Sequence, residues 1–147
     1  MGRLVGIARR DKKRAAMQIL DHAEISIAGG VANDFRGKSG ERQVTVISAR
    51  AWSQACEELG RDLPWTVRRA NLLVDNIDLP AAAGGLLTIG SVRLKINLET
   101  RPCSRMDEQC EGLKAALEPD WRGGLCCSVL QGGTVSIGDP VRSQNGS

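Results

Sequence analysis

Aromatic side chains are scarce in this chain, which has one phenylalanine, three tryptophans and no tyrosine. Proteins that bind single-stranded nucleic acid stack the bases on exposed aromatic rings. A chain with only 3% aromatic residues supplies few such rings. We therefore do not expect nucleic acid to be the main ligand.

Long apolar runs are also missing. None approaches the roughly 18 residues that a membrane-spanning helix needs, and no apolar stretch near the N-terminus precedes a small-residue cleavage site. These absences predict a soluble, cytoplasmic protein without membrane contact. A length of 147 residues with 41% hydrophobic content is typical of one domain. We expect this domain to cover residues 1–142 and a disordered polar tail to follow at residues 143–147.

Histidine is nearly absent, because His22 is the only one, and the cysteine count is odd at five. A zinc site or a nucleophile–histidine triad would have to use His22, which is remote in sequence from every cysteine. The irregular cysteine spacing and the missing export signal argue against a disulfide framework.

Positive charge is present but unevenly distributed. The net charge is +3, and residues 1–20 hold many basic residues against a single acid, Asp11. Most of the 20 cationic residues are arginines, which bind carboxylate and phosphate groups through two parallel hydrogen bonds. This composition favours an anionic ligand.

Short strands account for most of the pattern. Apolar and polar residues alternate in several β-branched runs that glycine-bearing turns separate. We expect eight strands, at residues 4–8, 24–28, 43–48, 69–75, 86–89, 92–98, 125–130 and 134–137. So many short strands in a small domain indicate a mainly β protein, a β-barrel with two or so peripheral helices.

Two segments have helical spacing. The first follows Ser48, a suitable N-cap, and runs to Leu59 before Gly60. The second covers residues 107–117 and is expected to stop before Pro119. Both helices are expected to lie against the barrel.

Cys103 is the thiol most suited to chemistry. It lies in the loop 99–106 between a strand and a helix, with Arg101 and Arg105 two residues away on either side. Guanidinium charges and a following helix N-terminus favour the reactive thiolate. The roles open to this sulfur are nucleophile, persulfide carrier and ligand to a soft metal.

The other cysteines have simpler interpretations. Cys56 and Cys110 fall on the apolar faces of the expected helices and are interpreted as small core residues. Cys126 and Cys127 are adjacent in an expected strand, so their side chains should point to opposite faces. One of them belongs to the core, and the other is free to face a pocket.

Four segments together resemble the MOSC domain, the C-terminal module of molybdenum cofactor sulfurases, in its small stand-alone bacterial form. They are residues 40–48, 68–74, 99–106 and the stretch from 122 to 141, within a best-matching core of about 25–142. The resemblance implies a β-barrel that binds a molybdenum cofactor of the molybdopterin type. It also implies an essential cysteine at the position of Cys103, which ligates molybdenum or carries persulfide sulfur. Pyridoxal phosphate, which belongs to a separate sulfurase domain, is not expected.

The phosphate of such a cofactor calls for guanidinium and polar donors. The candidate contacts are Arg36, Arg42, Arg68, Asn71, Arg101 and Arg122. If the metal is bound, reduction of N-hydroxylated substrates follows by resemblance. If it is not, Cys103 accepts sulfur from a cysteine desulfurase, and the expected partners are that enzyme, a redox protein or a second copy of the chain.

A non-catalytic interpretation also remains open. In it a small barrel binds an anionic ligand or nucleic acid through its arginines, and Cys103 is inert. Metal content, a labile sulfur adduct or steep salt dependence would separate the three hypotheses.

Overall fold

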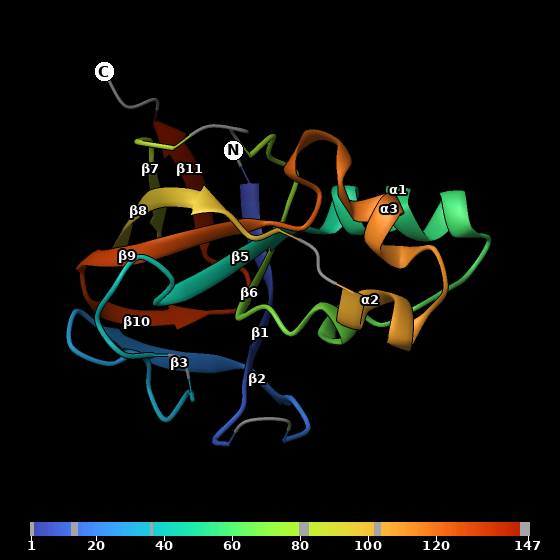
Figure 1. Ribbon diagram of the computed structural model, residues 1–147. Coiled ribbons are helices and arrows are strands. Elements are labelled where there is room, and N and C mark those ends of the chain that lie inside the picture. Colours follow the sequence, from blue (N-terminus) through green and yellow to red (C-terminus); the bar gives the residue numbers. More distant parts are fainter. Residues whose placement is uncertain (1, 13–14, 36, 80–82, 102–103, 145–147) are drawn as a thin grey trace.

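A computed structural model describes residues 2–12, 15–35, 37–79, 83–101 and 104–144 of the chain (Figure 1). Two of the expected site residues, Arg36 and Cys103, lie outside these ranges.

A closed barrel forms the body of the molecule. Within the described ranges it has seven strands, in the order β11–β7–β8–β9–β5–β6–β1. Pairing of Gly2 with Val141 and of Arg3 with Pro140 joins β1 to β11 and closes the ring. The strands are β1 (Gly2–Arg9), β5 (Val44–Ser48), β6 (Leu72–Asp75), β7 (Leu86–Ile89), β8 (Val92–Glu99), β9 (Leu125–Gln131) and β11 (Pro140–Gln144). The prediction of a mainly β barrel is confirmed.

A smaller sheet lies beside the barrel. It pairs β10 (Gly133–Ser136) with β3 (His22–Ser26) and β3 with β4 (Gly30–Val31), while β2 (Gln18–Leu20) extends the edge of β1. Each of the eight expected strands has a counterpart in the structure, whereas β2, β4 and β11 were not predicted.

The expected disordered tail at residues 143–147 is wrong for its first part. Ser143 and Gln144 belong to β11 and pair with Leu87 and Leu86 of β7. Backbone hydrogen bonding to a neighbouring strand needs no apolar side chain, so the polar composition of these residues gave no sign of it.

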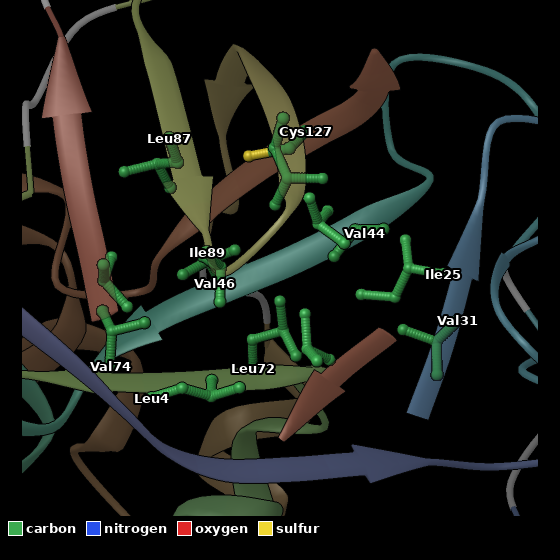
Figure 2. Packing of buried hydrophobic residues seen from close by; sticks show 14 of the residues in the cluster. Leu4, Ile25, Val31, Val44, Val46, Leu72, Val74, Leu87, Ile89 and Cys127 are labelled. Carbon is green, nitrogen blue, oxygen red and sulfur yellow. The ribbon is translucent and has the colours of Figure 1, made fainter. Parts of the chain in front are cut away.

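Figure 2 shows the barrel interior, where Leu4, Val46, Leu72 and Leu87 converge from different strands. The sulfur of Cys127 points into the same space. This core is a single cluster of buried apolar side chains contributed by both sheets. Such close packing makes the barrel a rigid support for the helices and loops that pack against it.

The helices lie together on one side of the barrel (Figure 1). Helix α1 (Ala49–Leu59) begins as expected, because the Ser48 hydroxyl accepts a hydrogen bond of 3.2 Å from the Ala51 amide. It ends at Gly60, whose φ of 66° suits glycine. A second apolar cluster, which includes Trp52 and Cys56, fills the space between α1, the other helices and the barrel.

The expected helix at residues 107–117 is instead two short helices, α2 (Ser104–Gln109) and α3 (Leu113–Leu117). Gly112 adopts a φ of 88°, outside the helical range, and separates them. Pro119 begins the 3-10 turn η2 (Pro119–Trp121), and a second turn, η1 (Trp65–Arg68), precedes β6. None of the helices in the described part of the chain has the length and apolar content to cross a bilayer.

Candidate functional site

A cleft of about 1250 Å³ opens where the end of β8, the turn between η1 and β6, and helix α2 meet. Among the residues that the structure describes, five lining residues are arginines, namely Arg10, Arg42, Arg68, Arg69 and Arg101. The carboxylates among the described lining residues are Asp34, Glu99 and Glu108. Because cations outnumber anions, the cleft favours a negatively charged ligand.

Arg68 is buried in the wall of this cleft, with 9% of its surface exposed. Its Nη2 donates to the Thr100 carbonyl at 2.7 Å, and its Nε donates to the Gly123 carbonyl at 3.0 Å. Its Nη1 lies 4.0 Å from the sulfur of Met106 in α2. Arg68 was expected to contact the cofactor, and in the structure its guanidinium joins three segments of the cleft wall.

Arg69, like Arg10, lines the cleft but was not among the contacts that the sequence analysis expected. It ends η1 in a left-handed conformation, with a φ of 63°, and its Nη2 donates to the Ala15 carbonyl. In the described structure its buried Nε has no hydrogen-bond partner. Burial lowers the pKa of Arg69 from its ordinary value. Arg69 could have been suspected because it follows Arg68, an expected cofactor contact. The sequence alone does not indicate which of the two arginines has a donor without a hydrogen-bond partner in the described structure.

Asn71, another of the expected cofactor contacts, also lines the cleft, but its side chain is largely hydrogen-bonded to the barrel. Its Oδ1 accepts hydrogen bonds from the Thr45 amide at 3.0 Å and the Thr45 hydroxyl at 3.2 Å. Its Nδ2 donates to the Ala8 carbonyl at 3.3 Å. Asn71 therefore ties β1, β5 and β6 together beneath the cleft.

The remaining expected arginines divide into two groups. Arg42 and Arg101 are exposed at the cleft, and the Arg101 Nε lies 3.9 Å from the Glu99 carboxylate. Arg122 is not among the lining residues that the structure describes.

Arg122 instead pairs with Glu58 of α1 at 2.8 Å and donates to the Ala116 carbonyl at 3.0 Å. Hydrogen bonding between Arg122 and Glu58 raises the pKa of Arg122 and lowers that of Glu58. Arg122 thus links α1 to α3, and in the described structure it does not join the arginines that line the cleft.

Cys126 and Cys127 point to opposite faces of β9, as predicted. The Cys126 sulfur lies 3.1 Å from the Thr100 hydroxyl, and Cys126 lines the cleft. Cys127 faces the barrel core, where burial strongly raises the pKa of its thiol. The cleft therefore contains one of the two thiols.

The segment that carries Cys103 is flanked by lining residues on both sides, Arg101 before it and Met106 after it. Within the described ranges no group of three or more histidine, cysteine, aspartate or glutamate side chains is arranged to hold a metal ion.

The family model of the MOSC domain matches residues 24–142. The chain belongs to the MOSC domain family. This MOSC domain is similar in structure to the YUAD protein from Bacillus subtilis, with a TM-score of 0.83 and 19% sequence identity. That match covers 100% of this chain and 98% of the other.

Two larger relatives share the fold. YiiM from Geobacillus stearothermophilus matches with a TM-score of 0.75 and 15% identity, covering 99% of this MOSC domain and 76% of YiiM. YiiM from Escherichia coli gives 0.72 and 14%, with coverage of 99% and 71%. No curated protein matches the sequence. These likenesses establish the barrel fold of this MOSC domain.

Proposed function

We propose that the cleft binds a molybdenum cofactor of the molybdopterin type, with Cys103 as the thiol that acts on or ligates its metal. MOSC domains as a family are associated with this cofactor. The observation that carries the proposal is the buried Nε of Arg69. In the described structure this donor has no hydrogen-bond partner, and Arg69 lines the cleft together with other arginines. A phosphate oxygen would satisfy this donor.

The lining residues fit such a group. Arg69 and Arg42 would hold the phosphate, and Arg68 and Asn71 would keep the cleft walls in place through their backbone hydrogen bonds. When bound, the cofactor would supply a metal that exchanges electrons with a substrate. By family resemblance this chemistry is the reduction of N-hydroxylated compounds.

Molybdenum content tests the proposal directly. Wild-type protein, Arg69→Gln and Cys103→Ser would be produced in a host that makes the cofactor and analysed for molybdenum and pterin. Arg93→Gln is a matched control, because Arg93 is exposed on β8 and is not among the described lining residues. We expect near-stoichiometric metal in wild type and Arg93→Gln, and a loss of about tenfold in Arg69→Gln, the equivalent of about 1.4 kcal/mol. Wild type without metal or pterin would refute cofactor binding.

A second function is sulfur carriage by Cys103, and the presence of another thiol, Cys126, in the lining of the cleft favours it. A cysteine desulfurase would supply the sulfur, and Cys103 would hold it as a persulfide. Protein that contains a reducible adduct of one sulfur atom on Cys103 and no molybdenum would support this function. Wild type that carries neither molybdenum nor a sulfur adduct would favour the non-catalytic function, in which the barrel only binds an anionic ligand.

A further inference from the structure

We infer that Trp121 binds the flat face of a fused heterocyclic ring, so that the cleft selects a ring-bearing anion over a simple anion such as phosphate. The inference rests on the proposed function, because Arg69 supplies the contact to the anionic group in both. It adds the residue that recognises the other half of the ligand. Pterins and purine nucleotides both belong to this chemical class.

Trp121 is the only aromatic residue among the described residues that line the cleft. Trp52 is buried in the apolar cluster under the helices, and Trp65 packs against the same cluster. The ring of Phe35 lies 5.8 Å from the Arg10 guanidinium carbon, and Phe35 is not among the described lining residues. Of the few aromatic rings in the described chain, Trp121 is therefore the one that a ligand in the cleft can contact.

Trp121 is half-buried because its side chain has two environments. It packs against the apolar cluster of the barrel interior, and it also lines the cleft. Val67, Leu98 and Met106 add apolar surface to the same cleft. Aromatic side chains bind flat heterocycles by stacking, because every such ring has a π-face. The cleft therefore offers a flat ring an aromatic and an aliphatic surface, together with arginines that bind anionic groups.

The backbone at Trp121 has a conformation that side chains rarely adopt. Asp120 and Trp121 both have left-handed φ values, of 50° and 56°. Such residues persist only where the surrounding structure enforces them, and they cluster at sites that bind ligands. Glycine would be free of this strain. The strained conformation thus agrees with a role for the indole ring in the cleft as well as in the packing of the barrel.

Hydrogen bonds on both sides of Trp121 enforce this conformation. The Arg122 amide donates to the Pro119 carbonyl at 3.0 Å, and the Gly124 amide donates to the Trp121 carbonyl at 2.9 Å. The Arg122 side chain is fixed in turn by its ion pair with Glu58. Trp121 is therefore preorganised, and a ligand has little conformational freedom to remove when it binds.

The cleft has room for both halves of such a ligand. Pockets of about 300 to 1000 Å³ enclose drug-sized molecules, and this cleft measures about 1250 Å³. Arg69 follows η1 and Trp121 ends η2, so two separate segments supply the contacts. A ligand with a ring and an anionic group can contact both residues, whereas phosphate has no ring for Trp121 to bind.

A titration with carboxypterin, a pterin that bears a carboxylate, tests the role of Trp121. Binding would be measured by the fluorescence anisotropy of the pterin in wild type, Trp121→Leu, which keeps an apolar side chain without a ring, and Trp121→Phe. Trp65→Phe is the matched control, because Trp65 is not among the described lining residues. We expect wild type and Trp65→Phe to bind alike, Trp121→Leu to bind about tenfold more weakly, and Trp121→Phe to fall between them. Equal affinity in Trp121→Leu and wild type overturns the inference.

Inorganic phosphate separates this inference from the anion site on which it rests. Phosphate should raise the melting temperature of wild type and Trp121→Leu equally, which also shows that the variant is folded. If Trp121→Leu does not fold, Trp121→Asn takes its place, because asparagine tolerates the left-handed backbone and has no aromatic ring. Wild type that binds phosphate but not carboxypterin overturns the inference and leaves the anion site intact. Wild type that binds neither probe overturns both.

Adenosine monophosphate as a second probe identifies the source of the ring. Tighter binding of carboxypterin assigns the ring to a pterin cofactor, and tighter binding of the nucleotide assigns it to a purine compound. Either result supports the inference if Trp121→Leu binds the preferred probe more weakly than wild type does. Binding that depends on Trp121 in a protein that gains no molybdenum in a cofactor-producing host refutes the cofactor and supports the inference.

Discussion

The barrel interior and the cleft wall are built from different interactions, although they share strands β5, β8 and β9. The interior is a continuous cluster of apolar side chains such as Leu72 and Leu94. The cleft holds two of the three buried polar or charged residues of the described chain, Arg68 and Asn71. Apolar packing is non-directional and tolerates exchange of similar volumes, whereas buried polar groups need specific partners. We therefore expect the barrel interior to contribute most of the folding stability, and the polar contacts of the cleft wall to fix the arrangement of the lining residues.

Truncation in the barrel should have the largest effect on stability and the smallest on the cleft. Leu72 is fully buried, so Leu72→Ala should lower the free energy of unfolding by about 3 to 4 kcal/mol through lost burial and a cavity. Urea unfolding measures this loss. Under native conditions, the alkylation rate of Cys126 should stay within about twofold of wild type. A large increase in the alkylation rate would mean that loss of packing in the barrel also loosens the cleft wall.

Removal of the Arg68 guanidinium should reverse that pattern. Arg68→Met keeps much of the side-chain volume but leaves the Thr100 and Gly123 carbonyls without this donor. We expect a loss of about 2 kcal/mol in unfolding free energy and a severalfold faster alkylation of Cys126 as the wall loosens. Arg68→Lys is the matched control, because one ammonium can restore one of the two bonds and part of the effect. Alkylation at the wild-type rate in Arg68→Met would contradict the role of Arg68 in the wall.

The same division explains how far the sequence could be interpreted. Strands with clear alternation, such as β8, were predicted because one face must be apolar to meet the core. The two-residue strand β4 is held by tertiary pairing and has too few residues to show alternation. The break at Gly112 was missed because the apolar positions on both sides keep helical spacing.

The cleft could be predicted only in part. Its arginine-rich character follows from composition, and the opposite orientation of Cys126 and Cys127 follows from strand geometry. Which arginines converge depends on contacts between distant segments. Arg122 forms an ion pair with Glu58 of α1. Arg69 lines the cleft from a residue with left-handed backbone conformation at the end of η1. Neither placement is encoded in local spacing.

A smaller effect on stability is expected at Arg69. Arg69→Gln removes a buried donor without a partner in the described structure but also the bond to the Ala15 carbonyl. These effects oppose each other, so the unfolding free energy should change by less than about 1 kcal/mol. Inorganic phosphate should raise the melting temperature of wild type and of Arg93→Gln but not that of Arg69→Gln. Equal phosphate stabilisation in all three proteins would place the anion away from Arg69.

The smallest effect should come from Glu58, whose pair with Arg122 links α1 to α3. Its pKa is lowered in the folded state, chiefly by the hydrogen bond from Arg122, so its ionised form favours folding. This contribution is present above the pKa of the unfolded chain and is lost as the pH falls through the lower folded-state pKa. Glu58→Gln should therefore be slightly less stable than wild type at neutral pH, and the difference should disappear in acid. Asp78→Asn is the control, because its pair with Arg50 joins side chains that are 94% and 76% exposed and should have no measurable effect. Denaturant midpoints between pH 7 and pH 3 measure both variants, and a Glu58→Gln difference that is constant across this range would show that packing, not charge, links α1 to Arg122.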